Sequence, residues 1–111
     1  MRNGFLGPDI FEVFNARIDQ DFVKFNAARP QVYTEFKKKV RELIAGGQQH
    51  YSADAILHVI RFGQVVNKKK GQFKINNNFS SRYARKFMEE HPQHRGFFRV
   101  RMLRNSYKDS P

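Results

Sequence analysis

Three groups of polar residues have types and spacings that could support chemistry. Asp54, His58 and Arg61 recur at i, i+4 and i+7, so a helix would place an acid, an imidazole and a guanidinium in one row. Such a row could serve a nuclease-like site, but its spacing matches no known nuclease signature. An acid in the first turn also simply favours helix formation. We therefore expect a solvated helix face here.

The second group is the pair His91 and His94, which could bind one metal ion. Pro92 lies between them, and the sequence contains no cysteine to complete a thiolate-containing set of zinc ligands. Ala45–Gln48 lacks the Lys-Ser/Thr of a phosphate-binding loop. We expect no enzymatic activity, no metal and no cofactor, and we expect His91 to cap the carbonyl end of a helix.

The third group is a basic helix expected over about residues 79–90. A period of 3.6 residues places its aromatic residues on one side and most of its cations on the other. Asn and Ser donors precede the cations, as suits a helix that enters the major groove of DNA. The candidate groove contacts are Ser81, Arg82, Arg85, Lys86 and one or both of Asn77 and Asn78.

Positive charge is concentrated in the second half of the chain. The 111 residues carry a net charge of +11. Residues 1–60 have 8 basic and 7 acidic side chains, whereas residues 61–111 have 13 basic and 3 acidic ones. A concentrated positive potential attracts polyanions, of which nucleic acid is the commonest in cells. The bases expected to hold phosphates are Lys68, Lys69, Lys70, Lys74, Arg99, Arg101 and Arg104.

Hydrophobic spacing predicts the elements that would position these residues. Apolar residues recur at three-and-four spacing in four segments and at alternate positions in two others. The twelve Phe and an apolar fraction of 40 % are enough for a core. The expected helices cover about residues 10–29, 30–45, 52–63 and 79–90, and the expected strands cover residues 72–76 and 97–103.

This order of elements resembles a winged-helix variant of the helix-turn-helix. The expected fold class is therefore α+β, with three N-terminal helices followed by strand, helix and strand. The resemblance implies that the later helix enters the major groove while the strand pair contacts the backbone. The 16 residues from Gln64 to Phe79 depart from the family's tight turn. We expect one domain over residues 1–104 and a flexible tail over residues 105–111.

A second resemblance concerns the segment from Phe73 to Met88 with Gly96-Phe97-Phe98. It is similar to small uncharacterised proteins encoded by bacteriophages, over roughly residues 33–103. This similarity implies a phage or prophage origin and brings no assigned mechanism.

The leading functional prediction is a non-enzymatic, cytoplasmic protein that binds double-stranded DNA. If about six to eight phosphates are neutralised, affinity should fall roughly 10³-fold between about 50 and 200 mM salt. One alternative is a phage-encoded ligand that inhibits an acidic host protein. Another is an RNA-binding module in which Tyr83, Phe97 or Tyr107 stacks on bases. No segment is apolar enough to indicate a membrane partner, and the oligomeric state stays open.

Overall fold

The computed structural model describes residues 9–67 and 73–99. Within these residues the chain forms four α-helices and one short 3-10 helix, and it contains no β-strand. No helix in this part of the chain has both the length and the apolar character that crossing a bilayer requires. The elements are α1 (Ile10–Ala28), α2 (Pro30–Ala45), α3 (Ala53–Val66), α4 (Phe79–Glu90) and η2 (Pro92–His94).

Local sequence signals fix the ends of these helices. Asp9 caps α1 through a capping box with Glu12, which satisfies amide groups that have no partner within the helix. Pro30 begins α2, where its fixed φ suits a first turn. Gly47, with φ +93°, follows the end of α2. The Ser52 hydroxyl accepts a hydrogen bond from the amide of Ala55 at the start of α3.

Aromatic side chains form the centre of the fold. Tyr83 of α4 is fully buried, and its ring lies 4.8 Å from Phe22 of α1 and 5.4 Å from Phe36 of α2, centroid to centroid. Phe87 and Phe98 extend the cluster toward the C-terminal end of α4. Aromatic pairs at these separations contribute about 0.5–1.5 kcal/mol beyond their buried area. Many of the phenylalanines thus belong to a single hydrophobic core.

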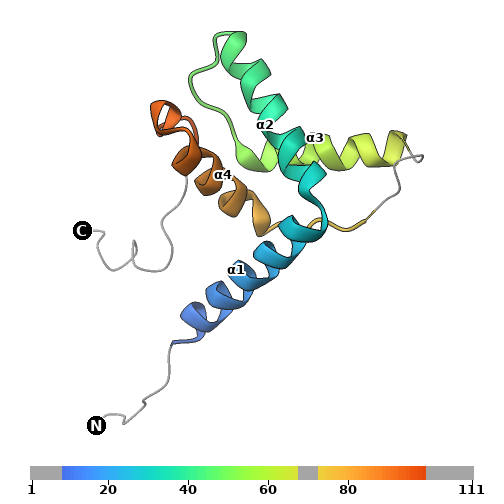
Figure 1. Ribbon diagram of the computed structural model, residues 1–111, viewed down its shortest axis with the longest axis vertical. Coiled ribbons are helices and arrows are strands. Elements are labelled where there is room, and N and C mark those ends of the chain that lie inside the picture. Colours follow the sequence, from blue (N-terminus) through green and yellow to red (C-terminus); the bar gives the residue numbers. More distant parts are fainter. Residues whose placement is uncertain (1–8, 68–72, 100–111) are drawn as a thin grey trace.

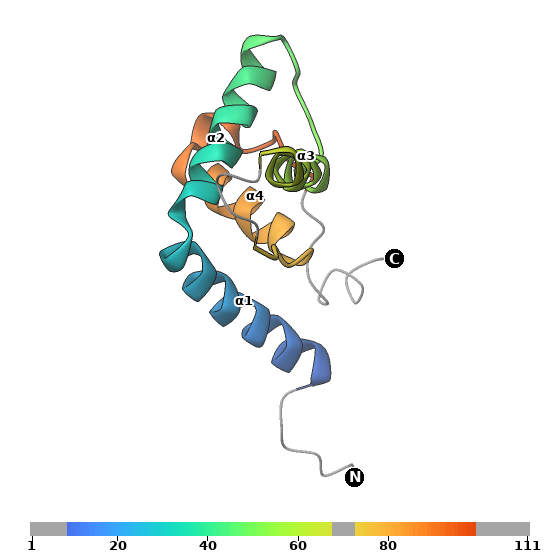
Figure 2. The same cartoon turned by 90° about the vertical axis from the view of Figure 1, so that its right-hand side faces the viewer.

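Helices α2 and α4 are the central elements, because each of them packs against the other three helices (Figure 1). Only the C-terminal half of α1 joins the core, through Ile18 and Phe22. The first turns of α1 extend away from the other three helices in both views (Figure 2). The protein therefore consists of a three-helix body, made of α2, α3 and α4, and a helix that is anchored to that body at one end.

The predicted α+β, winged-helix-like fold is wrong, because the described residues include no sheet. Residues 73–76 are extended but unpaired: Gln64 accepts the Phe73 amide hydrogen, and Arg61 donates to the Ile75 carbonyl. Side chains thus satisfy the backbone groups that a neighbouring strand would otherwise pair. Phe97 and Phe98 are both buried at consecutive positions, which a half-buried strand does not allow. The rest of the second predicted strand, residues 100–103, and the predicted tail, residues 105–111, lie outside the described residues.

Candidate nucleic-acid interface

One side of α4 remains open between the elements that surround it. Phe79, Tyr83 and Phe87 point into the core, so the opposite side carries the residues with access to solvent. Ser81, Arg85 and Met88 follow one another there at i, i+4 and i+7 and are each partly exposed. Two hollows adjoin this side of α4, one at each end.

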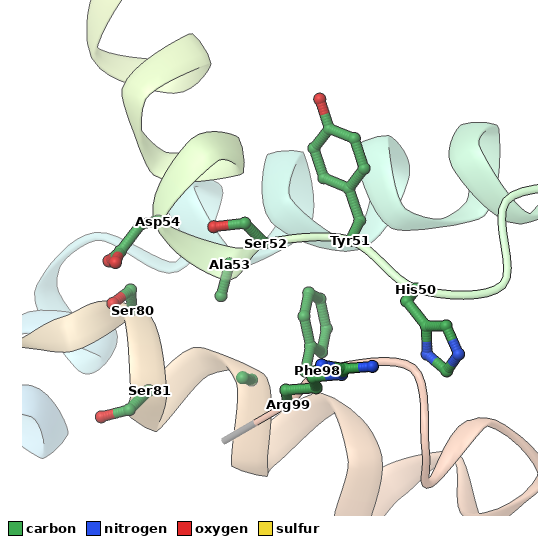
Figure 3. A pocket seen from close by; sticks show the side chains of 10 residues that line it. His50, Tyr51, Ser52, Ala53, Asp54, Ser80, Ser81, Phe98 and Arg99 are labelled. Carbon is green, nitrogen blue, oxygen red and sulfur yellow. The ribbon is translucent and has the colours of Figure 1, made fainter. Parts of the chain in front are cut away.

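The first hollow, which we call the α3–α4 cleft, has a volume of about 640 Å³ and lies where the starts of α3 and α4 meet. Ser80 and Ser81 line it from α4, and Arg99 lines it from the segment after η2 (Figure 3). His50 joins the wall on the side away from Asp54 (Figure 3). Because helix starts present amide hydrogens and a partial positive charge, this cleft suits an anionic oxygen. Its lining residues are His50, Tyr51, Ser52, Ala53, Asp54, Ser80, Ser81, Ala84, Phe98 and Arg99.

Two contacts to backbone carbonyls, one from a backbone amide and one from an imidazole, hold the walls of this cleft together. The amide of Tyr51 donates to the Phe97 carbonyl over 3.3 Å, and the His50 Nδ1 lies 3.2 Å from the Gly96 carbonyl oxygen. The segment before α3 is therefore fastened to the turn that carries Arg99. This fastening fixes one wall of the cleft relative to the first turn of α4.

The second hollow, of about 320 Å³, lies at the other end of the open side and places Arg85 and Arg95 beside Met88 and Pro92. Glu89 also lines it. Arg85 and Arg95 thus lie at one end of the open side of α4, and Arg99 lies at the other end, near Ser81. An acid lines each of these hollows as well, Glu89 in the second and Asp54 in the α3–α4 cleft. We call this surface the α4 basic face, and it consists of Ser81, Arg85, Arg95 and Arg99.

Arg82 does not belong to this face, although it was predicted as a groove contact. Its side chain is only 9 % exposed and points toward α1. Nε donates to the Asp19 carboxylate over 2.9 Å. The two terminal nitrogens donate to Asn15, to Ser81 Oγ and to the Asn78 carbonyl. Arg82 therefore joins α1 to α4, and its donors are used within the fold.

Lys86 is also engaged within the fold. Its Nζ lies 2.9 Å from Glu90 and 5.2 Å from the centroid of the Tyr33 ring, and the Tyr33 hydroxyl donates to Glu90 over 2.6 Å. Burial favours the neutral form of Glu90, but the hydrogen bonds from Tyr33 and Lys86 outweigh it and lower the pKa of this carboxyl. The pKa of Tyr33 is raised, first by burial and then by the neighbouring Glu90.

Lys74, Asn77 and Asn78 lie around a different hollow, of about 1000 Å³, formed with α1 and α3. Asp21 and His58 also line it. The Asn76 side chain accepts the amide hydrogen of Asn78, and α4 has no side-chain cap at its first turn among the described residues. Asn78 occupies the N-cap position of α4 without capping it through its side chain.

The structure separates the described members of the predicted site onto four surfaces, one of which is the hollow around Lys74, Asn77 and Asn78. Ser81, Arg85 and Arg99 share the α4 basic face, Lys86 faces α2, and Arg82 is buried against α1. The predictions that concern Lys68, Lys69, Lys70, Arg101 and Arg104 lie outside the described residues. His50 and Arg95 could not be predicted from the sequence, because neither a motif nor helical spacing singles them out.

The other candidate groups have structural roles. Arg61 donates to the Ile75 carbonyl, and Asp54 and His58 are exposed. His91 Nδ1 lies 2.9 Å from the Phe87 carbonyl oxygen, so the predicted helix-end role of this histidine is confirmed. Within residues 9–67 and 73–99, no three acids or histidines gather as metal ligands would.

Comparison with known proteins adds no relative: no protein-family model, no curated protein and no solved structure gives a significant match to this chain.

Proposed function

We propose that this protein binds nucleic acid, with duplex DNA as the favoured form, and that it contacts the phosphate backbone through the α4 basic face. The observation that carries the proposal is that Arg85 and Arg95 line a hollow at one end of the open side of α4, while Arg99 lines the hollow at the other end. Guanidinium groups bind phosphate oxygens in a bidentate manner. Arginines at both ends of one helix side therefore match a repeating polyanion better than they match one small ligand.

The α3–α4 cleft supports the same proposal. Its Ser80 and Ser81 hydroxyls lie at a helix start whose amides have no side-chain cap, and such amides commonly bind phosphate. Among the described residues that line the two hollows, His50 and Tyr51 present exposed rings at the α3–α4 cleft, whereas Phe98 is buried. Exposed rings can stack on bases, so competition between duplex DNA and single strands distinguishes phosphate contact from base stacking at this cleft.

The test measures binding of a short, fluorescent DNA duplex by anisotropy as salt rises from about 50 to 200 mM. A variant with Arg85, Arg95 and Arg99 all changed to Ala should lose most of its affinity. Its log–log salt slope should become shallower by about three, because each phosphate contact contributes about one.

The matched control removes the same charge from elsewhere on the protein. Arg17, Lys24 and Lys38 are exposed residues of α1 and α2, away from the α4 basic face. Their combined change to Ala should leave the salt slope nearly unchanged. Equal effects of the two triple variants would mean that net charge, not this surface, attracts DNA. Equal binding to polyglutamate and to the duplex would instead favour an acidic protein partner.

A further inference from the structure

The projecting first turns of α1 carry an apolar patch that no described residue covers. Ile10 is 79 % exposed, and Val13 and Phe14 are each about half exposed. These residues lie at i, i+3 and i+4, so they share one side of the helix. We call Ile10, Val13 and Phe14 the arm patch.

A second apolar surface lies on the body of the protein. Val59, Phe62 and Val66 project from α3, and Phe62 is 68 % exposed. They border a groove of about 740 Å³ between α3 and the start of α2, with Val32 and Ile60 at its base. We call this the α2–α3 groove. Phe73 lies at its edge, and the guanidinium carbon of Arg29 stands 4.2 Å from the centroid of that ring.

The two surfaces cannot meet within one molecule, because the first turns of α1 extend away from α2 and α3 (Figure 1 and Figure 2). Charge also differs between the two parts. Residues 9–28 contain four acids and two bases, whereas the other described residues contain five acids and twelve bases. An acidic arm with an apolar side thus faces outward from a basic body that has an apolar groove.

We propose that the arm patch of one copy docks into the α2–α3 groove of a second copy. A two-fold dimer would make this contact twice, once with each arm, and would close the assembly. Specific protein interfaces bury about 1,200–2,000 Å² in total, and a large aromatic side chain contributes about 150–250 Å². Phe14 is 49 % and Phe62 is 68 % exposed, so each can bury only about half to two-thirds of that area. Two such contacts reach the lower end of this range when their Val and Ile neighbours are included.

Charge complementarity orients the contact. Asp9 and Glu12 flank the arm patch, whereas Arg29 lies over Phe73 at the edge of the α2–α3 groove. Lys39 and Glu35 both line the groove and pair with each other, so Arg29 is the cation offered to the acids of the arm. Opposite charges across the rim of an interface chiefly favour correct orientation and encounter. The proposal does not depend on nucleic-acid binding, because the arm patch and the groove share no residue with the α4 basic face.

Sedimentation of the full chain over a range of concentrations tests the proposal. The native protein should form dimers at micromolar concentration, and Phe14→Ser or Phe62→Ser should each weaken the dimer at least tenfold. Val23→Ser is the matched control, because Val23 is 67 % exposed on α1 and lies outside the arm patch. This control should dimerise like the native protein. A monomeric native protein, or equal weakening by all three variants, would overturn the proposal.

Cross-linking gives a second readout that does not require these substitutions. The chain has no cysteine, so single cysteines can be introduced cleanly as Val13→Cys in the arm patch and Val66→Cys in the groove. Mixing the two variants, one of them isotope-labelled, should give the mixed disulfide in excess over either symmetric one under mild oxidation. A dominant Val13→Cys homodimer would show arm-to-arm pairing and contradict docking in the groove.

Discussion

Arg82 provides the most direct test of how the fold is held together. Replacing it with Met keeps an apolar stem of similar length but removes the donors to Asp19, Asn15, Ser81 and the Asn78 carbonyl. Hydrogen bonds to charged groups contribute about 1.5–3 kcal/mol each, although contributions within one network do not add. Asp19 is about half exposed and can recover water, so we expect a total loss of about 2–3 kcal/mol in the free energy of unfolding.

The measurement is urea unfolding followed by far-UV circular dichroism, with Arg17→Met as the control. Arg17 is an exposed residue of α1, so the same substitution there should change the free energy of unfolding by less than about 0.5 kcal/mol. A second measurement separates the fold from the function. At a temperature where the variant stays folded, Arg82→Met should retain the DNA salt slope of the native protein. An unchanged unfolding free energy, together with a slope shallower by about one, would refute the structural role and restore Arg82 as a phosphate contact.

Further predictions follow from other contacts. Tyr83→Phe should raise the unfolding free energy by about 1 kcal/mol in thermal or urea unfolding, because the buried hydroxyl has no hydrogen-bond partner among the described residues. A decrease of the unfolding free energy by more than about 1 kcal/mol would mean that the hydroxyl is hydrogen-bonded. Phe36→Ala should cost about 3–5 kcal/mol, since this ring is fully buried between Tyr33, Tyr83 and Phe98; a cost below about 1 kcal/mol would contradict the central position of this ring. The pKa of Glu90 is lower in the folded protein than in the unfolded chain, where it is near 4.5. The ionised carboxylate therefore stabilises the fold above that pH, and this stabilisation is lost as the pH falls through the folded-state pKa. The raised pKa values of Tyr33 and Tyr83 add stability below about pH 10 that is lost as pH rises further. Unfolding measured against pH should therefore decline at both extremes, and Tyr33→Phe should flatten both limbs; a variant with the native pH profile would show that Tyr33 does not interact with Glu90.

The helices could be predicted from the sequence because their signals are local. Asp9, Pro30 and Ser52 begin helices at the positions where capping chemistry predicts them. Helix α3 continues to Val66, past the stop predicted at Gly63. A single glycine lowers helix propensity by only about 1 kcal/mol, and the residues packed around α3 outweigh that cost.

The strands and most of the candidate site could not be predicted, because they depend on contacts between distant segments. The alternation of Phe73 and Ile75 correctly predicts which side chains turn inward. A strand also needs a neighbouring strand, however, and here the side chains of Gln64 and Arg61 supply the hydrogen bonds instead. A helical wheel places Arg82 outside the aromatic stripe of α4. It cannot show that α1 crosses at that point and brings Asp19 within 2.9 Å.

The position of Arg82 also couples the stability of the two parts of the protein. Its only anionic partner among the described residues comes from α1, so separating α1 would leave this guanidinium in the body without a neighbouring carboxylate. Phe22 would leave the rings of Phe79 and Tyr83 in the same event. We therefore expect the helix that projects most to be needed for the body to stay folded. The chain should unfold in one cooperative transition, and no shorter fragment that lacks α1 should retain a native core.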